Sequence, residues 1–499
     1  RKRNLFQRLR TREVTIMRNH MFSAIILLFL CGCTIGPDYV KPTIETPSTW
    51  TVSYEAADNL VNTSWWQQFN DPVLDDLITT ALADNLDIKA ATARVDQFLG
   101  QYRTTRSEYF PQIGASASAY RQKDTETGLF PGDNDDYSSY QGALNASWEI
   151  DLWGRIRRSN EAAQAEVLAS EAGRRTVLLT LVSNVANSYL TLRGLDRQLE
   201  IARETERAYA ESLRIFNLRH DYGTVSQVEV SQVESEYEDA RQAVPQLESL
   251  IAQQEHLLSV LLGSNPKSIK RGKTIDALTT PEIPADLPSE LLEQRPDIIQ
   301  AEQELIAANA RIGVARSLYF PSVALTGSYG TASINSDDLF EGASAIWDIG
   351  GNVLAPIFTF GAIEGQVMAS EAAQREALYR YQQSIIAGFR DVEDALVATT
   401  KGREALAAKG RRVNALQTYA KLASAQYEAG TTGYLQVLDA NRSLFSGQLD
   451  YVQTQTAVLT SLVDIYRSMG GGWIDMADNG TRTAVEASEQ EVAAQPATK

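Results

Sequence analysis

The side chains best suited to covalent chemistry are two cysteines near the start, Cys31 and Cys33, and no further cysteine follows them. Residues 21–30 before them form an apolar run with basic residues upstream. The run is shorter than the roughly 20 residues that a membrane-spanning helix needs, so it predicts the core of a signal peptide. Gly32 supplies a small residue directly before Cys33, whose thiol could take a diacylglycerol before cleavage frees its amine for a further acyl chain. We therefore expect a signal peptide at residues 17–32 and a covalent lipid on Cys33.

An ordinary signal peptide with incidental cysteines is the alternative explanation. Thr34 follows Cys33, and similarity to bacterial lipoproteins implies that a residue other than aspartate here directs the protein to the outer membrane. Several acyl chains anchor a protein firmly, whereas a single chain holds it marginally. Residues 1–16 have no inferred role, and Met17 and Met21 both fit as the natural start.

The sequence shows no other pattern typical of catalysis or metal binding. The three histidines, His20, His220 and His256, are scattered, and no Gly-rich phosphate loop or Ser/His/Asp spacing occurs. His220 and Asp221 are adjacent, but no nucleophile accompanies them. We therefore expect no enzyme, no metal site and no cofactor apart from the lipid on Cys33.

The composition favours long helices and argues against a nucleic-acid partner. The formal net charge is −17, and no basic stripe is present to neutralise phosphates. Prolines number 15 and glycines 31 among 499 residues. Most of the length is rich in Ala, Gln, Glu, Leu and Arg, which is typical of long helices and coiled coils.

Residues 145–158 change from a strand pattern to a helix pattern within one short passage. Apolar and polar side chains alternate here, with Leu144, Ala146, Trp148, Ile150 and Leu152 on one face and Asn145, Ser147, Glu149 and Asp151 on the other. This period of two indicates a strand. A soluble sheet could show it, but so could a strand with lipid on one side and water on the other.

A second alternating stretch precedes this strand, in residues 112–120 (Ile113, Ala115, Ala117 and Ala119). Helical periodicity runs before it over residues 74–109 and ends where Pro111 follows. We expect strands near 112–120 and 140–152, joined by a polar loop. Their length of about ten residues is what a membrane barrel strand needs.

A very long helix is predicted from Arg155 to about residue 218. Seven residues spaced three and four apart form a heptad seam with one polar member, namely Leu178, Leu181, Val185, Ser188, Leu192, Leu195 and Leu199. Roughly 64 residues at about 1.5 Å each would extend on the order of 95 Å. A turn then leads into a return helix at residues 227–262, in which Pro245 should cause a kink.

The pattern then recurs. Residues 107–111 (SEYFP) reappear as 317–321 (SLYFP), and Gly223 and Gly263 correspond to Gly430 and Gly470. An offset held at 207 to 210 residues indicates two internal repeats. The second copy predicts strands near 321–332 and 343–358, followed by its own helical hairpin.

These patterns divide the chain into seven parts. They are an upstream extension at 1–16, a signal peptide at 17–32, an acylated extended segment at 33–73, a first repeat at 74–266, a linker at 267–288, a second repeat at 289–473 and a disordered tail at 474–499.

Four strands per chain cannot close a membrane barrel, and open sheet edges are not tolerated in lipid. The smallest such barrels have eight strands, so two copies would give only a narrow, filled barrel. Closed rings are the economical form of oligomer. The predicted fold is an α+β membrane protein: a homotrimer whose 12-stranded β-barrel continues into a long α-helical coiled-coil barrel behind the membrane.

The chain resembles the outer membrane factor (TolC-like) family, in its NodT-type lipoprotein branch serving resistance-nodulation-division efflux pumps. The motifs are residues 148–157 (WEIDLWGRIR), 294–298 (QRPDI), 307–315 with 319–322 (AANARIGVA, YFPS), and 65–69 with 71–72 (WWQQF, DP). The similarity covers residues 33–473. It implies a trimeric, passive, gated outer membrane duct that exports small molecules such as drugs. It also implies two partners, a periplasmic adaptor and an inner-membrane pump.

In this family the two helix–helix turns meet the adaptor and form the periplasmic entrance. The resemblance therefore implies adaptor-contact tips at Tyr222, Gly223, Thr224 and Ser226, and at Gly430, Thr431 and Gly433. Simple turn chemistry is the alternative, because glycine ends helices readily at positive φ.

Four residues match or depart from the family's aperture. Asp439 matches an aspartate lining the entrance, and three copies would make an acidic ring; a solvated helix residue is the alternative. Gln436 stands where some relatives carry a second acid, so the ring would be single. Tyr427 matches a tyrosine used in closing contacts. Thr432 stands where some relatives have arginine, so their gate salt bridge has no counterpart at this position.

Two other functions stay open. One is the exit duct of a type I protein secretion system, and the other is a lipid-anchored coiled-coil structural protein that does not conduct. The alternating strands argue against the second, and the cysteine motif with the NodT-type residues favours efflux over the first.

Overall fold

A computed structural model describes residues 34–43, 50, 56–57, 64–123, 136–281, 283–284 and 294–470. The predicted signal peptide, Cys33, the loop tip at 124–135 and the predicted tail lie outside the described residues. The chain divides into two compact units. Of the described residues, the strand unit contains 34–43, 95–123, 136–169 and 301–381, and the helical unit contains the remainder up to 470.

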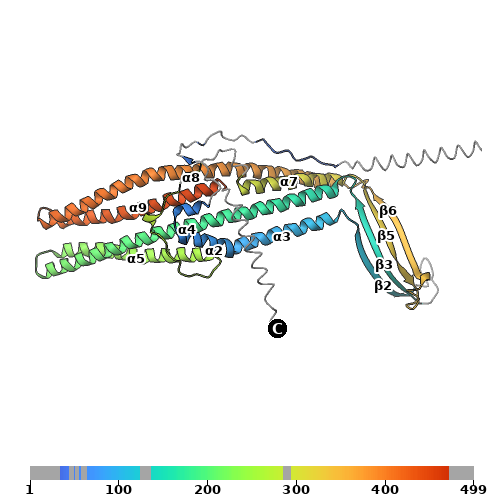
Figure 1. The fold of residues 1–499 in the computed structure, drawn as a ribbon, viewed down its shortest axis with the longest axis horizontal. Coiled ribbons are helices and arrows are strands. Elements are labelled where there is room, and N and C mark those ends of the chain that lie inside the picture. Colours follow the sequence, from blue (N-terminus) through green and yellow to red (C-terminus); the bar gives the residue numbers. More distant parts are fainter. Residues whose placement is uncertain are drawn as a thin grey trace, which may run out of the picture. The chain divides into compact units, whose positions relative to one another are not determined.

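The strand unit contains one antiparallel sheet in the order β2-β3-β5-β6 (Figure 1). Its strands are β2 (Gln112–Gln122), β3 (Tyr137–Ile150), β5 (Ser322–Ser333) and β6 (Ala345–Leu354). The four predicted strands are present. The last is shorter than the predicted 343–358, because Gly342–Ser344 forms a 3-10 turn and Pro356 cannot donate to a sheet ladder.

The register places the predicted apolar residues on one face of this sheet. Leu144 faces Ala115 on one side and Tyr329 on the other, and Tyr329 in turn faces Trp347. The same face carries Ile113, Ala146, Trp148, Ile150, Val323, Leu325, Ile349 and Val353. The opposite face is mostly polar, with Ser116, Asn145, Ser147, Glu149, Thr326, Ser328, Asp348 and Asn352.

Six helices of the described residues form three pairs of equal length. These are α3 (Leu86–Ser107) and α7 (Pro296–Ser317) with 22 residues, α4 (Arg155–Asp221) and α8 (Ala362–Glu428) with 67, and α5 (Gln227–Leu261) and α9 (Tyr434–Ser468) with 35. The recurring sequence pattern thus has a counterpart in the element lengths. Among the helices of the described ranges, none is long and apolar enough to cross a membrane.

The prediction of one continuous helix over residues 74–109 is wrong. Residues 74–109 form two helices, α2 (Pro72–Asp84) and α3, which Asn85 separates. The Asn85 side chain accepts hydrogen bonds from the amides of Asp87 and Ile88 at 2.8 and 3.1 Å, and donates one to the carbonyl of Leu261 at 2.9 Å. Asparagine therefore caps α3 and attaches it to the end of α5. Pro245, in contrast, lies within an uninterrupted α5.

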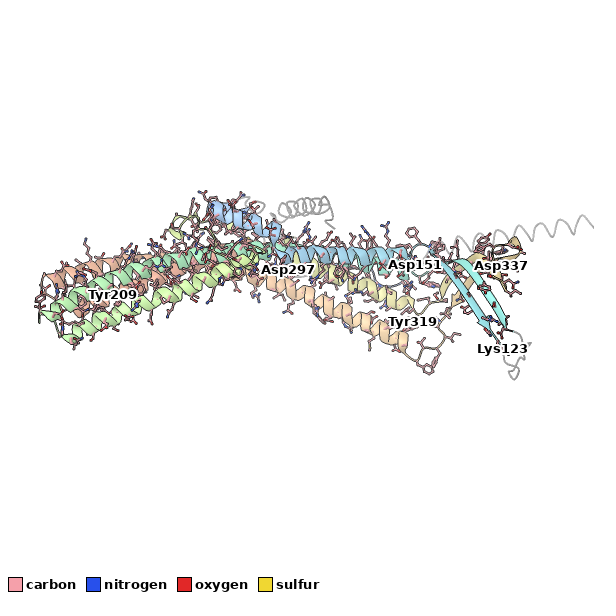
Figure 2. The ribbon with its side chains drawn as sticks, turned by 90° about the horizontal axis from the view of Figure 1, so that it is seen from below. Lys123, Asp151, Tyr209, Asp297, Tyr319 and Asp337 are labelled. Carbon is pink, nitrogen blue, oxygen red and sulfur yellow. The ribbon has the colours of Figure 1, made fainter. Side chains whose placement is uncertain are left out.

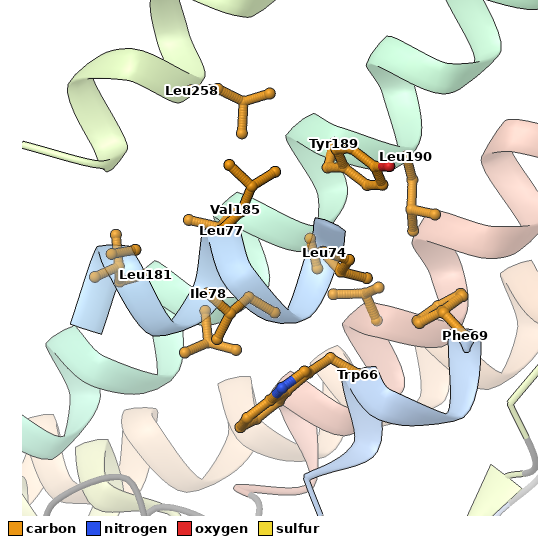
Figure 3. Packing of buried hydrophobic residues seen from close by; sticks show 14 of the residues in the cluster. Trp66, Phe69, Leu74, Leu77, Ile78, Leu181, Val185, Tyr189, Leu190 and Leu258 are labelled. Atoms are coloured by element: carbon orange, nitrogen blue, oxygen red, sulfur yellow. The ribbon is translucent and has the colours of Figure 1, made fainter. Parts of the chain in front are cut away.

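The helical unit has a core in which the heptad seam of α4 packs against α2 and the 3-10 helix η1 (Trp65–Phe69) (Figure 3). Five of the seven predicted seam residues are buried, and Leu195 and Leu199 pack against them. Trp65 is fully buried and stacks on Tyr466 at 5.2 Å. Ile269 and Ile275 are buried in the same core, so the segment predicted as a linker packs against the helices.

A matched pair of leucines tests this packing. Leu258 is fully buried in the core, whereas its neighbour Leu257 in the same helix is 48% exposed. We expect Leu258→Ala to lower the free energy of unfolding by about 2–5 kcal/mol, and Leu257→Ala by about 0.5 kcal/mol. Thermal unfolding in detergent, followed by the helical circular dichroism signal, checks this. Equal losses would contradict the packing.

Candidate functional site

The first helix–helix turn joins α4 to α5 through a glycine in left-handed conformation. Gly223 has φ of 69°, and its amide donates to the carbonyl of His220 at 2.7 Å. The amide and hydroxyl of Thr224 both donate to the carbonyl of Arg219 at 2.8 Å. This is the Schellman pattern that ends a helix. Ser226 then caps α5 in a reciprocal capping box with Glu229.

The second turn, between α8 and α9, repeats this geometry. Gly430 has φ of 71° and bonds to the carbonyl of Tyr427 at 2.9 Å, while the amide and hydroxyl of Thr431 donate to Gln426 at 2.9 Å. Gly433 occupies the cap position and provides no side-chain cap. The seven predicted tip residues therefore all lie in two equivalent turns. Tyr222, at the first, is 84% exposed.

Three of the four predicted aperture residues line one groove beside the second turn. Thr432, Gln436 and Asp439 lie along a depression of about 750 Å³. The other residues of its wall come from α5, α8, α9 and the turn: Gln232, Ser235, Glu236, Tyr419, Gly433, Leu435, Leu438 and Arg442. The Thr432 hydroxyl donates to the side-chain oxygen of Gln436, so these two residues are paired with each other.

Charges of both signs meet in this groove. Arg442 lies 3.4 Å from the carboxylate of Asp439 and 4.0 Å from that of Glu236. Burial raises the pKa of Glu236, and Asp239 and Asp439 add to the rise, while Arg442 opposes it. The hydroxyl of Tyr419 lies 3.5 Å from Asp439. Two carboxylates thus share one guanidinium, and the groove keeps an acidic excess in each chain.

Tyr427 is not in the groove but in an aromatic cluster on α4, α8 and α9. Its ring lies 6.3 Å from Phe216 and 5.0 Å from Tyr434. Arg219 donates to its hydroxyl at 3.0 Å and lies 5.9 Å from its ring centre. An arginine from the first hairpin therefore reaches the tyrosine that we matched to a closing contact.

Phe216, Arg219 and Tyr434 were not predicted as site residues. Tyr427 lies at the end of α8 and Tyr434 begins α9, on either side of the second turn, so their spacing in sequence gives no helical signal that they share a face. The contact of Arg219 with Tyr427 joins residues 208 apart. Neither periodicity nor a local motif indicates such a contact.

A second group of polar residues shapes the junction between β3 and α4, where Asp151 lies (Figure 2). Its carboxylate accepts bonds from the amides of Ile156 and Arg157 at 3.2 and 2.9 Å, so it caps the helix. Arg155 pairs with Glu149 at 2.9 Å. Trp153 donates to the carbonyl of Pro321 at 2.7 Å and its ring centre lies 4.8 Å from that of Phe320. Tyr319, labelled in Figure 2, is the neighbour of Phe320 in the sequence.

Within the described ranges, no group of three or more His, Cys, Asp or Glu side chains is arranged to hold a metal ion. The acidic groups of the groove are instead accompanied by Arg442.

The comparisons with known proteins agree on one family. The family model described as outer membrane efflux protein matches residues 77–264 and 287–471. The toluene efflux pump outer membrane protein TtgC of Pseudomonas putida is 34% identical over 469 residues, which are 92% of this chain and 97% of that protein. The cation efflux system protein CusC of Escherichia coli is 34% identical over 453 residues, or 90% and 98%. The crystal structure of the Campylobacter jejuni CmeC outer membrane channel matches 91% of this chain and 98% of that chain, with a TM-score of 0.84 and 26% identity.

The chain belongs to the outer membrane efflux protein family. The resemblance seen in the sequence motifs is therefore confirmed. The protein is an outer membrane efflux channel whose helical part lies in the periplasm, and its family is one of channels.

Proposed function

We propose that three copies of this chain close their sheets into one 12-stranded barrel and act as the outer membrane duct of a tripartite efflux system. The observation that supports this proposal is the open four-stranded sheet. In the described part of the chain, β2 and β6 each pair on one side only, and open edges are not stable in lipid. The apolar face would meet lipid and the polar face would line the water-filled lumen.

The partners follow from the family. The two helix–helix turns would meet a periplasmic adaptor, and a resistance-nodulation-division pump in the inner membrane would supply the energy. The relatives are named for toluene and for cations, so the pump rather than the duct would choose among small molecules. These names give no support to the protein-secretion alternative.

The lipid is part of the proposal. A diacylglycerol on Cys33 and an acyl chain on its freed amine would anchor each protomer in the outer membrane lipid. A single acyl chain would bind the membrane only marginally. No other cofactor is proposed. Mass spectrometry of the N-terminal peptide, with Cys33→Ser as control, tests this modification.

Native mass spectrometry and planar-bilayer recording of the purified, acylated protein test the duct. A trimer that conducts supports the proposal. A monomer or dimer would contradict the barrel of 12 strands. A trimer that never conducts, even after deletion of the second turn, would favour the structural coiled-coil protein.

Two substitutions in β6 test which face meets lipid. Ile349 belongs to the apolar face and Asn352 to the polar face. Lysine on a lipid-facing strand costs about 2–4 kcal/mol per chain near the bilayer centre, so we expect Ile349→Lys to prevent most membrane insertion. Asn352→Lys should insert normally and shift conductance towards anions. Heat-resistant trimers recovered from outer membranes measure insertion, and equal yields of the two variants would contradict the assignment of faces.

A further inference from the structure

The segment next to the predicted lipid, residues 34–41, belongs to the strand unit although it has no regular secondary structure. We call it the docked segment. The amide of Ile35 donates to the carbonyl of Trp153 at 3.0 Å. The side-chain amide of Asn309, in α7, donates to the carbonyl of Pro37 at 2.9 Å. The first residues after Cys33 are therefore held between the β3–α4 junction and α7.

Glycines allow this contact to be very close. A Cβ at Gly313 would lie 2.6 Å from the carbonyl oxygen of Ile35, and one at Gly36 would lie 2.5 Å from the Cα of Gly313. A Cβ at Gly154 would lie 2.8 Å from the side chain of Thr34. Each distance is shorter than carbon contacts allow, so the backbone of the docked segment rests directly on the backbones of α7 and the junction.

Charged side chains fasten the other end of the docked segment. Arg158 is buried, with 5% of its side chain exposed, and donates to Asp38 at 2.6 Å and to Glu161 at 2.8 Å. Glu302 accepts from the hydroxyl of Tyr39 and from Lys41, both at 3.1 Å. The Asp38 side chain itself is 89% exposed, so this end of the segment is held by a guanidinium that is buried and positioned by Glu161 rather than by a buried ion pair.

The docking site lies beside aromatic side chains that suit a membrane surface. Trp153 packs on Phe320, while Phe110 and Tyr319 are 63% and 51% exposed. Phe110 lies two residues before β2, and Tyr319 and Phe320 lie just before β5. Aromatic residues with such exposure are typical of the interface between lipid and water.

We propose that the docked segment is a fixed mount for the lipid anchor, which makes the acyl chains enter the bilayer beside the β3–α4 and α7–β5 junctions. The inference rests on the proposed lipidation of Cys33. Consecutive Cα atoms are about 3.8 Å apart, so a lipid carried by the residue before Thr34 leaves the chain within one residue of the mount. The lipid and the apolar face of the sheet then enter the membrane at one level, and the partner of this surface is the inner leaflet of the outer membrane.

The mount can be tested with a palmitate analogue that carries a photoreactive diazirine near its carboxyl end. After incorporation in cells and illumination, we expect crosslinked peptides to contain Trp153 or residues 319–323. Gly313→Ala should reduce these crosslinks severalfold. Gly100→Ala is the matched control, because a Cβ at this glycine of α3 meets nothing within 4 Å.

A second variant keeps the test independent of folding. Asp38→Asn neutralises one of the two carboxylates that pair with Arg158 and leaves the other, Glu161, in place. Hydrogen exchange of the Ile35 amide should become faster by about tenfold in both Gly313→Ala and Asp38→Asn, and stay unchanged in Gly100→Ala. Acylation with crosslinks scattered over other peptides, or with an Ile35 amide that is unprotected in the unaltered protein, would overturn the mount alone. No incorporation of palmitate would overturn the lipidation, and the mount with it.

Discussion

Replacing Asp439 with asparagine is expected to make the open channel less selective for cations. Asp439 lies on the groove beside the second turn, half exposed, and three copies around an axis would form an acidic ring. A carboxylate attracts a cation about 8 Å away in water by about 0.5 kcal/mol. Three carboxylates together would therefore raise the concentration of cations at the ring about tenfold at low salt. Arg442 at 3.4 Å offsets part of this. We therefore expect the cation-to-anion permeability ratio to fall by about two- to fivefold.

Two further substitutions separate charge from shape. Asp439→Glu keeps the carboxylate and should preserve selectivity. Arg442→Gln removes the guanidinium shared with Glu236 and should change selectivity in the opposite direction, towards cations. Reversal potentials in asymmetric KCl, at low and high salt, measure all three variants. The difference in selectivity between each charge variant and the unaltered protein must shrink at high salt, because the Debye length falls from about 10 Å at 0.1 M to about 3 Å at 1 M. Unchanged selectivity in Asp439→Asn would discard the acidic ring and keep the duct.

The sheet could be predicted because each strand carries its own signal. Residues such as Leu144, Trp148 and Leu325 alternate with polar neighbours, and an alternating strand has only one arrangement that places all its apolar residues on one face. The register between strands brings them together. The heptad seam of α4 was predictable for the same reason: a local period determines a face.

Contacts between distant residues could not be predicted in this way. Asn85 ends a helix without a proline or glycine, because its side chain caps α3 and reaches Leu261 176 residues away. Arg219 meets Tyr427 through the pairing of two hairpins. Arg158 directly follows the motif at residues 148–157, but nothing in that stretch indicates Asp38 as its partner. Such contacts depend on tertiary structure, which local periodicity does not contain.

The largest loss of stability is expected at Asp71, the helix-capping residue of α2. It is fully buried. Its carboxylate accepts bonds from the amide of Val73 at 3.0 Å, the hydroxyl of Tyr189 at 2.8 Å and the amide of Lys273 at 3.0 Å. Tyr189 also accepts from the amide of Gly272 at 3.0 Å. Burial raises the pKa of Tyr189, so this hydroxyl stays protonated and able to donate. One carboxylate therefore joins α2, α4 and the segment after α5.

Asp71→Ala would leave three buried donors without an acceptor. Loss of a cap costs about 0.5–2 kcal/mol, and each orphaned donor about 1–3 kcal/mol. We expect the free energy of unfolding to fall by about 3–6 kcal/mol. Asp71→Asn should not restore it, because its amide group would present a donor where the amide of Lys273 already donates. Gly272→Ala should have a similar effect, since a Cβ there would lie 2.0 Å from the Asp71 carboxylate.

Asp76 provides the control, because it belongs to the same helix and is exposed. Asp76→Ala should change stability by less than about 0.5 kcal/mol. Thermal unfolding of the trimer in detergent compares the four variants, and hydrogen exchange of the Lys273 amide locates the damage. If Asp71→Ala unfolds like Asp76→Ala, water or a neighbouring group must satisfy the three donors, and Asp71 does not fasten the segment after α5. If exchange at Lys273 accelerates while the strands of the sheet stay protected, the carboxylate secures the helical unit independently of the strand unit. Protein that still forms trimers in membranes could then test whether conduction requires this attachment.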